Sequence, residues 1–398
     1  MAKETLRQLL NRAAAAIETP DDLYAADRRA IAADLLNCKS PDAHPLVGQS
    51  FPVLDQGFVK LVRFMGGDAE IVEAARLTAQ SEGKEVGGDR NLLRFLMRHS
   101  HSTPIEFFEI VLHVRCPMDV WRQWIRHRTA NVNEYSTRYT AAIDACQQTQ
   151  PDEWRTQSTS NRQGSAGVLG GAWPPGYTFD AATGRVFLPV DTTMQMVDGY
   201  AEIDGVHRAY IAVRGETNTL NGYLTDREQD VHVLCREAYE ERLALGVAKE
   251  QARKDLPLSN YTEAYWKIDG GNLINFLRLR MDGHAQKEIR DYATLIGEQI
   301  LSQLCPMLWE AFNDYVFQAM KLTRLDQVVI KNLLVNAQRQ LCTDPGDDRT
   351  SSVAPSFIPP YGLSEFTAAQ YDDWKPLEKC RERDECLSKL VKLGIVAA

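Results

Sequence analysis

The stretch RHRTANVNEYSTRY, residues 126–139, concentrates more hydrogen-bonding chemistry than a solvated loop requires. Its cation-capable side chains are Arg126, His127, Arg128 and Arg138. They surround the amide of Asn133 and the carboxylate of Glu134. Guanidinium and hydroxyl groups bind phosphate, whereas amides and carboxylates can orient a ring. The composition suggests a pocket for an anionic, hydrogen-bonding ligand, and a charged loop at a solvated helix end is the alternative.

The preceding segment, MDVWRQWIRHR, has the pattern of a helix that opens at Pro117. Successive helix residues are about 100° apart, so Arg126, His127 and Arg128 cannot all face one ligand from a regular helix. Either the helix frays after Arg126 or the three side chains serve different partners. Gln123 and Arg126, about one turn apart, would share a face.

The segment TANVNEYS contains poor helix formers, which predicts a loop after the helix. In an extended loop, side chains at alternate positions point to the same side. Glu134, Ser136 and Arg138 would then lie together.

Two other segments have similar chemistry. In HSHSTPIEF, His101 and Thr103 are polar groups next to a helix terminus, although a capped surface loop would look the same. In IDGGNLINFLRLR, residues 269–271 lead into a helix that contains Asn275 and Arg280. Free backbone N–H groups at a helix start can hold a diphosphate, and glycines allow close approach. Ordinary helix capping explains the glycine pair equally well.

The composition of the 398-residue chain, 44% hydrophobic and 25% charged, is that of a soluble globular protein. Its net charge of -9 argues against a general nucleic-acid surface. Any anion site must therefore be local. Between residues 115 and 139, five Arg stand against Asp119 and Glu134, a local net charge of +3. No apolar run approaches the roughly 20 residues that a membrane span needs.

Eight cysteines are scattered along the chain without a CxxC pair. Cys380 and Cys386, the closest pair, lack the spacing of a zinc site. The N-terminal segment has the pattern of an amphipathic helix and lacks that of a signal peptide. These features predict a cytoplasmic protein with free thiols and no metal site.

The elements that must position these residues indicate an α+β fold with a helix-dominated core. FPVLDQGFVKLVRFMG (51–66) and FFEIVLHVRCP (107–117) predict strands, with a helix at IVEAARLTAQ between them. Residues 174–228 form a β-rich insertion with Gly- and Asp-rich turns. We therefore expect an N-terminal helical extension over 1–50, a main domain over 51–340 and a C-terminal extension over 341–398. The last of these contains a Pro-rich linker at PSFIPPYG and a predicted short charged helix near KCRERDECLSKLVKL.

The central stretch resembles the signature of the flavin-dependent thymidylate synthases, RHR-x-x-S-x-N-E-x-S-x-R-Y. Every fixed position matches except the first Ser, which is Asn131 here. The resemblance extends in the family's order through LDQGFVKLVRFMG, DRNLLRFLMRHSHSTPIEF, QSTSNRQGS, ARKDLPLSNYTEAYW and NLINFLRLRMDGHAQ. It spans about 51–335, with the insertion looped out.

The resemblance implies an α+β fold with a mainly antiparallel sheet and a homotetramer whose active sites lie between subunits. It implies that the enzyme methylates dUMP to dTMP with methylenetetrahydrofolate, while NADPH reduces a bound FAD. Neither nucleic acid nor membrane is an expected partner.

Site residues follow position by position from the same resemblance. The implied dUMP contacts are Gln123, Trp124, Ile125, Arg126, Glu134, Tyr135, Ser136, Thr137, Arg138, Arg253 and Arg280. The implied FAD contacts are Thr103, Arg126, His127, Arg128, Glu134, Asp269, Gly270, Gly271 and Asn275. His101 would lie near the flavin and the folate path. Because Asp269–Gly271 departs from the family's usual side chains, contacts there are expected from the backbone.

The expected catalytic residues are Arg280 and His101. A guanidinium at the uracil N3–C=O edge would stabilise the ring anion that activates C5, and Arg280 is the candidate. Ser136 is interpreted as a phosphate or base contact, because no His or Lys is placed by sequence to activate it as a nucleophile.

Two alternatives remain open at this point. One is a flavin- and folate-dependent methyltransferase acting on uracil in RNA, although no GxGxxG dinucleotide-binding motif joins a strand to a helix. The other is a catalytically silent nucleotide-binding homologue.

Overall fold

The computed structural model describes residues 44–79, 86–159, 164–190, 197–203, 205–212, 219–324, 326–330 and 381–393. The chain divides into two compact units, residues 1–317 and 318–398. Every candidate site residue lies in the first unit. The helices expected before residue 44, and the Pro-rich linker expected near residue 355, lie outside the described residues.

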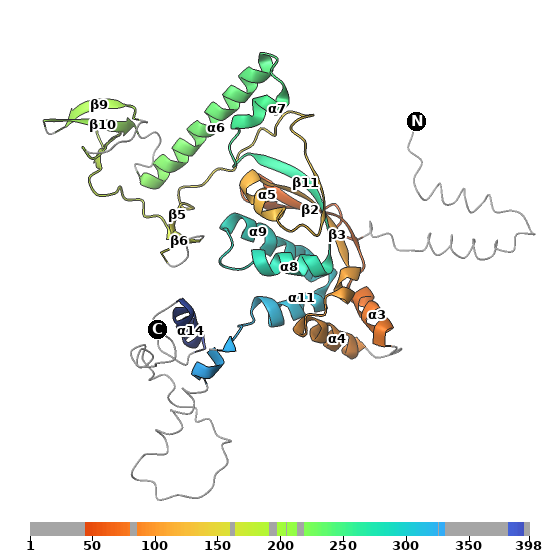
Figure 1. The fold of residues 1–398 in the computed structure, drawn as a ribbon. Coiled ribbons are helices and arrows are strands. Elements are labelled where there is room, and N and C mark those ends of the chain that lie inside the picture. Colours follow the sequence, from red (N-terminus) through yellow and green to blue (C-terminus); the bar gives the residue numbers. More distant parts are fainter. Residues whose placement is uncertain are drawn as a thin grey trace, which may run out of the picture. The chain divides into compact units, whose positions relative to one another are not determined.

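A five-stranded antiparallel sheet runs through the first unit (Figure 1). Its strands, in spatial order, are β1 (Ser50–Val53), β2 (Gly57–Met65), β3 (Glu109–Pro117), β11 (Tyr261–Asp269) and β4 (Asn131–Glu134). The segment 51–66, which the sequence predicts as strand, is a hairpin of β1 and β2. The expected α+β class with a mainly antiparallel sheet is confirmed.

Alternation along β3 determines which face of the sheet is buried. Ile110, Leu112 and Val114 are at most 1% exposed, whereas His113 between them is half-buried. On β11, which pairs with β3 in register Tyr265↔His113, Trp266 is likewise buried. One face of the sheet therefore belongs to the core, as expected for period-two side chains.

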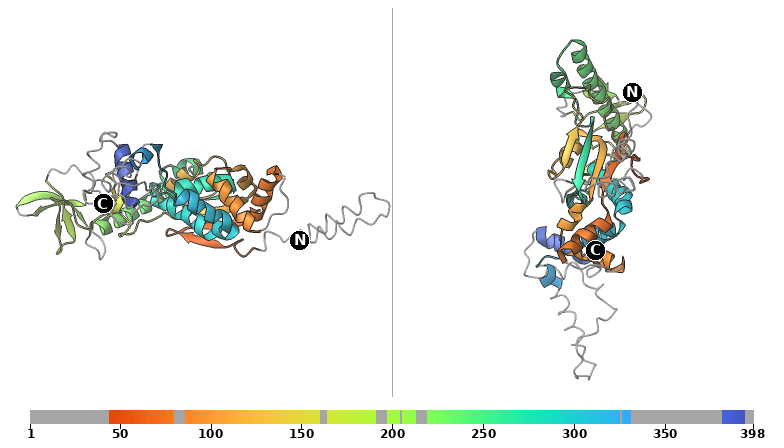
Figure 2. Two further views of the ribbon diagram at one scale, coloured as in Figure 1. Left: turned by 90° about the horizontal axis from the view of Figure 1, so that it is seen from below. Right: turned by 90° about the vertical axis from the view of Figure 1, so that its right-hand side faces the viewer.

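Helices pack along the buried face (Figures 1 and 2). They are α3 (Asp68–Ala79), α4 (Val86–Arg98), a 3-10 turn (Thr103–Phe107), α5 (Met118–Trp124), α8 (Gly270–Arg280), α9 (Lys287–Leu295), α10 (Ser302–Leu304) and α11 (Pro306–Phe312). π-helical segments cover Ile296–Leu301 and Asn313–Phe317. Trp124 is central to this packing, with ring centroids 5.1 Å from Phe276 and 5.3 Å from Trp266.

The predicted β-rich insertion contains a second antiparallel sheet, of order β7-β8-β10-β9. Its strands are β7 (Thr178–Asp180), β8 (Arg185–Phe187), β9 (Gly199–Ile203) and β10 (Val206–Ala212). Helix α6 (Leu220–Ala244) begins inside the predicted range, so residues 220–228 are helical and not β. Thr219 caps this helix by accepting the Gly222 N–H, a local signal that outweighs the preceding β pattern.

Four shorter elements lie before and after the insertion and α6. β5 (Arg155–Gln157) and β6 (Ser165–Val168) form a two-stranded hairpin before it. After α6 come α7 (Lys249–Ala252) and a 3-10 turn (Arg253–Asp255).

In the second unit, α14 (Arg381–Lys392) confirms the charged helix predicted near the C-terminus. Its Lys389 Nζ lies 2.5 Å from Asp326 Oδ2, so an ion pair links the helix to residues 326–330. Among the described residues, none of the helices combines the length and the apolarity that a membrane span requires.

Candidate active site

Helix α5 determines which side chains of the central stretch face the core. Trp121 and Trp124, three positions apart, are buried, and Gln123 is turned partly to solvent. The regular helix ends at Trp124, and a turn follows in which the His127 N–H donates to the Trp124 carbonyl at 3.0 Å. The side chain of Trp124 lies inside the core, so this residue can offer a nucleotide only its backbone. Ile125 is 42% exposed.

The end of α8 meets this turn through Arg280. Its Nε donates to His127 Nε2 at 3.0 Å, and its Nη2 donates to the Gln123 carbonyl at 3.1 Å. Burial, together with the nearby charge of Arg280, lowers the pKa of His127 to about 4. The imidazole is therefore neutral at neutral pH, and its Nε2 lone pair accepts from the guanidinium. Phe276 contacts the same ring edge-on at 4.9 Å.

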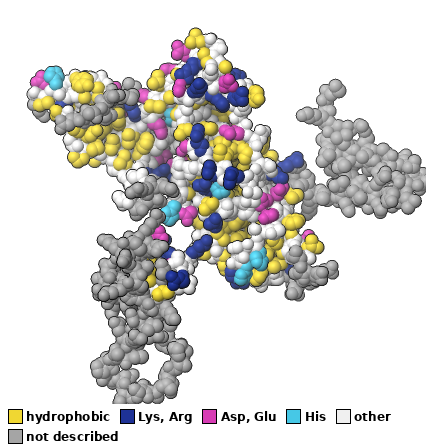
Figure 3. Space-filling model, viewed as in Figure 1, with side chains coloured by type: hydrophobic (Ala, Val, Ile, Leu, Met, Phe, Trp, Pro, Cys, Tyr) yellow, Lys and Arg dark blue, Asp and Glu magenta, His cyan; other side chains and the backbone are white. Residues whose placement is uncertain are grey.

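Arg126 and Arg128 point elsewhere. Both are exposed, and neither has a hydrogen bond or ion pair to any residue that the structure describes. Lys and Arg side chains gather on the surface over α5 and α9 (Figure 3). The prediction that consecutive cations of the stretch serve different partners is consistent with this arrangement, because His127 binds Arg280 while its neighbours face solvent.

The predicted loop after the turn is in fact a short edge strand, β4, which pairs with β11. Backbone pairing with a strand distant in the sequence overrides the poor local propensities of TANVNEYS. Glu134 lies opposite Ala264, and its Oε1 accepts from the buried Thr262 hydroxyl at 3.0 Å. The Tyr135 hydroxyl donates to the Ala141 carbonyl at 2.8 Å, closing the turn that follows.

That turn carries the hydroxyls and the last cation of the stretch. Arg253 Nη1 donates to Thr137 Oγ1 at 2.5 Å. Arg138 is exposed and pairs with Glu250 at 3.1 Å. Ser136 organises the turn, since its carbonyl accepts from the Thr140 hydroxyl at 2.8 Å. The structure thus joins Arg253 to the stretch through Thr137.

A second group of predicted residues lines a cavity of about 160 Å³ at the start of α8. His101, Gly271 and Asn275, which come from two separate segments, lie on its walls. Thr103 is exposed at the adjacent 3-10 turn. Helix α8 therefore connects both groups, because its first turns line this cavity and its last residue is Arg280.

The backbone at the start of α8 is less available than predicted. The Gly270 N–H donates to the Phe108 carbonyl at 2.6 Å, and the Asn272 N–H donates to the Asp269 carboxylate at 2.9 Å. Two of the N–H groups expected to be free are therefore occupied. Gly270 is required for packing, since a Cβ there would collide with the Ile105 carbonyl oxygen.

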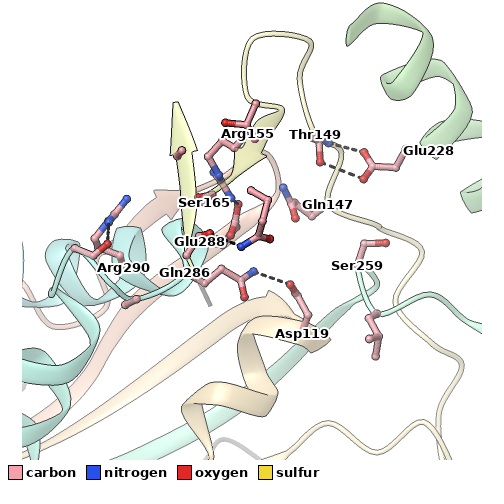
Figure 4. A pocket seen from close by; sticks show the side chains of 17 residues that line it. Asp119, Gln147, Thr149, Arg155, Ser165, Glu228, Ser259, Gln286, Glu288 and Arg290 are labelled. Atoms are coloured by element: carbon pink, nitrogen blue, oxygen red, sulfur yellow. Dashed lines mark hydrogen bonds and ion pairs between the residues drawn. The ribbon is translucent and has the colours of Figure 1, made fainter. Parts of the chain in front are cut away.

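Sequence reasoning missed a polar connection behind Gln123. The Gln286 side chain accepts from Gln123 Nε2 and donates to Asp119 Oδ2 at 2.9 Å. Asp119 and Gln286 line a polar cavity of about 620 Å³, shown in Figure 4. The sequence signal for Gln286 is the segment HAQ, residues 284–286, which is part of the quoted resemblance although no role was predicted for it.

Comparisons with known proteins identify the family of the chain. The family model described as thymidylate synthase complementing protein matches residues 60–307. The flavin-dependent thymidylate synthase of Wolbachia pipientis wMel is 36% identical over 282 residues, covering 71% of this chain and 82% of that protein. The enzyme of the same name from Dictyostelium discoideum is 38% identical, covering 70% of this chain and 78% of that protein.

One solved structure that resembles the chain is a UMP/dUMP methylase PolB from Streptomyces cacaoi bound with 5-Br dUMP. The TM-score is 0.48 at 24% identity, with 67% of this chain and 98% of that chain covered. The family model spans more than half of the chain, and the sequence relatives cover more than two thirds of it. The chain belongs to the family of flavin-dependent thymidylate synthases.

Proposed function

We propose that this chain converts dUMP to dTMP, with methylenetetrahydrofolate as carbon donor and NADPH as reductant, through a bound FAD. Family membership supports the reaction class. One observation about Arg280 connects this proposal to a particular side chain. The half-buried Arg280 guanidinium is held by a neutral imidazole and a backbone carbonyl. Neither acceptor bears a negative charge, so the positive charge of Arg280 remains available to a ligand.

Arg280 has donors to spare for that ligand. A guanidinium carries five N–H groups, and the contacts with His127 and Gln123 use two of them, which leaves three. Placed against the uracil N3–C=O edge, these donors would stabilise negative charge on the ring and so enrich C5. Because burial reduces dielectric screening, such stabilisation is stronger here than in water.

The nucleotide would be held by the turn after β4. Arg253 and Arg138 supply cations, and Ser136 and Thr137 supply hydroxyls, a combination suited to a phosphate monoester. Arg126 is exposed and is free to join them. Glu134, fixed by Thr262, would lie between this turn and the flavin residues.

The residues present fit FAD, a ligand with an anionic diphosphate and a hydrogen-bonding ring. Arg128 supplies an exposed cation, and Asn275 and His101 supply polar groups on the cavity wall. A Cβ at Gly271 would lie 3.1 Å from Glu106 Cγ, so its absence leaves room at that wall. When bound, FAD would supply hydride transfer, while these residues hold it and position the nucleotide beside it.

A homotetramer with shared active sites forms part of the proposal. Arg126, Arg128 and Thr103 are exposed in the single chain, so a neighbouring subunit has room to close the site. A cytoplasmic location is also proposed, supported by the free thiols that the structure describes at Cys116, Cys146, Cys235, Cys305 and Cys386. Mass measurement of the native assembly tests the tetramer.

One experiment tests the reaction against both alternatives. The purified full-length protein is assayed for bound flavin, then incubated with methylenetetrahydrofolate, NADPH and either dUMP or uracil-containing RNA. Methylated products, dTMP among them, are quantified chromatographically. We expect bound FAD and dTMP formation that requires dUMP, methylenetetrahydrofolate and NADPH. Bound FAD without dTMP would favour a silent homologue, and methylation of uracil in RNA without conversion of dUMP would favour the RNA enzyme.

A further inference from the structure

A line of three polar side chains connects the first turn of α5 to the proposed nucleotide site. Asp119 Oδ2 accepts from Gln286 Nε2 at 2.9 Å, as Figure 4 shows, and Gln286 Oε1 accepts from Gln123 Nε2. The two glutamines lie 163 positions apart, so tertiary packing brings them together. Gln123 also contributes its backbone carbonyl to Arg280.

The chemistry of Asp119 fixes the direction of this line. A carboxylate only accepts hydrogen bonds, whereas an amide can present either its oxygen or its NH₂ group. The NH₂ group of Gln286 must therefore face Asp119, which turns its oxygen towards Gln123. Gln123 must in turn present its NH₂ group to Gln286, so its oxygen is left for other partners.

A second carboxylate, Glu288, lines the same cavity as Gln286. Burial opposes ionisation of Glu288, but its hydrogen bond with Arg155, 2.7 Å long, helps to hold its pKa below the ordinary value. The Gln286 amide thus lies in a cavity that two acidic side chains line, and a rotation of the amide would place its oxygen against the Asp119 carboxylate.

We infer that Asp119 and Gln286 are positioning residues that fix the Gln123 amide so that its oxygen accepts a hydrogen bond from the nucleotide. This inference rests on the proposed function. dUMP has two hydrogen-bond donors besides its phosphate, namely the uracil N3–H and the sugar 3′-hydroxyl. With the N3 edge assigned to Arg280, the 3′-hydroxyl is the donor for Gln123.

The decisive variant is Asp119→Asn. An amide at position 119 can accept a hydrogen bond from Gln286 or donate one to it, so the Gln286 and Gln123 amides are no longer fixed in one orientation. Its effect is read from binding alone, by calorimetric titration of the FAD-loaded protein with dUMP and with 2′,3′-dideoxy-UMP. We expect the unmodified protein to prefer dUMP by about two- to thirteenfold, the range of one hydrogen bond between neutral groups. In Asp119→Asn the ratio of the two dissociation constants should fall towards one, while the amount of bound FAD stays unchanged.

Two further variants test whether the effect passes through Gln123. Gln286→Met keeps the length of the side chain without its hydrogen bonds and should lose the same preference. In a Gln123→Met background, Asp119→Asn should cause no additional loss, because the residue it orients is gone. The surface variants Asp230→Asn and Gln299→Met are matched controls that should retain the preference, and circular dichroism checks folding.

The outcomes separate this inference from the proposed reaction. A preference that survives Asp119→Asn, in a protein that binds dUMP and forms dTMP, overturns the positioning role alone. Binding with the expected preference but without dTMP formation overturns the reaction and leaves the positioning role supported. Failure of the unmodified protein to bind dUMP overturns both.

Discussion

Arg280 Nε lies 3.0 Å from His127 Nε2, and the guanidinium is the donor in this contact. A cation that donates to an imidazole requires the ring to be neutral, and burial together with the Arg280 charge lowers the pKa of His127 to about 4. The pairing holds Arg280 without neutralising it, which distinguishes it from an ion pair with a carboxylate.

Arg280→Lys should reduce kcat by about 100- to 1000-fold, the cost of removing one preorganised stabilising group. Lysine lacks the planar fork that contacts His127 and the Gln123 carbonyl while retaining donors for a ligand. FAD content should change little. Arg227→Lys, at a surface pair with Asp230, is the control. Equal loss of turnover and of bound FAD would contradict the role assigned to Arg280.

His127 should make stability dependent on pH. Its pKa is about 4 in the folded chain and about 6.5 when unfolded, so between these values the unfolded state binds more protons. The free energy of unfolding should therefore fall as the pH is lowered from 6.5 to 4. For this half-buried ring the contribution is about 1 kcal/mol after solvent screening.

Urea unfolding at pH 7 and pH 5 measures this contribution. The His127→Asn variant should show a smaller difference between the two pH values than the unmodified protein. His207→Asn, at an exposed position on β10, serves as the control. Identical pH dependence in all three proteins would show that His127 is not titrating as expected.

The glycine pair at the start of α8 should respond unequally to alanine. Gly270→Ala places a Cβ against the Ile105 carbonyl oxygen, a backbone atom that cannot move away, and should cost about 2 kcal/mol or more. Gly271→Ala meets the flexible Glu106 side chain at 3.1 Å and should cost less than about 1 kcal/mol. Chemical denaturation of both variants measures the difference. Equal costs would argue against a packing role for Gly270.

Local patterns explain which parts of the fold could be predicted. In β3, the buried Ile110, Leu112 and Val114 alternate with less buried positions, two of which are His113 and Arg115, and this part of the pattern is visible in the sequence alone. β4 has four exposed positions, of which three are polar and one is Val132, and it exists because β11 supplies its hydrogen bonds. A polar edge strand of this kind carries no local signal of its own.

In the candidate site, too, local sequence identifies some residues but not the contacts that position them. The signature stretch and the helix before it identified Glu134 and Gln123, but the contacts of these two side chains depend on residues far away in the sequence. The Thr262 hydroxyl reaches Glu134 from a strand 128 positions later, and Gln286 reaches Gln123 across 163 positions. The glycine pair at the start of α8 shows a further limit of prediction from sequence. Glycine is favoured both where a backbone N–H binds a ligand and where the backbone packs closely, so the residue type alone does not distinguish the two roles.

Thr262→Val should weaken ligand binding while preserving the fold. Valine has nearly the same shape but cannot donate to Glu134 Oε1, which the buried Thr262 hydroxyl reaches at 3.0 Å. Without this bond the exposed carboxylate loses its fixed orientation on the edge strand. The dissociation constants for dUMP and FAD should rise by at most about 13- to 160-fold, the full net worth of a hydrogen bond to a charged group.

Titration of the variant with each ligand, alongside thermal unfolding, separates binding from stability. Thr183→Val is a matched control, because it removes a hydroxyl–carboxylate bond of 2.6 Å to Asp180 within the small sheet. We expect the control to bind both ligands normally. If Thr262→Val bound them equally well, Glu134 would owe its position to the strand pairing alone, and the hydroxyl would have no part in the site.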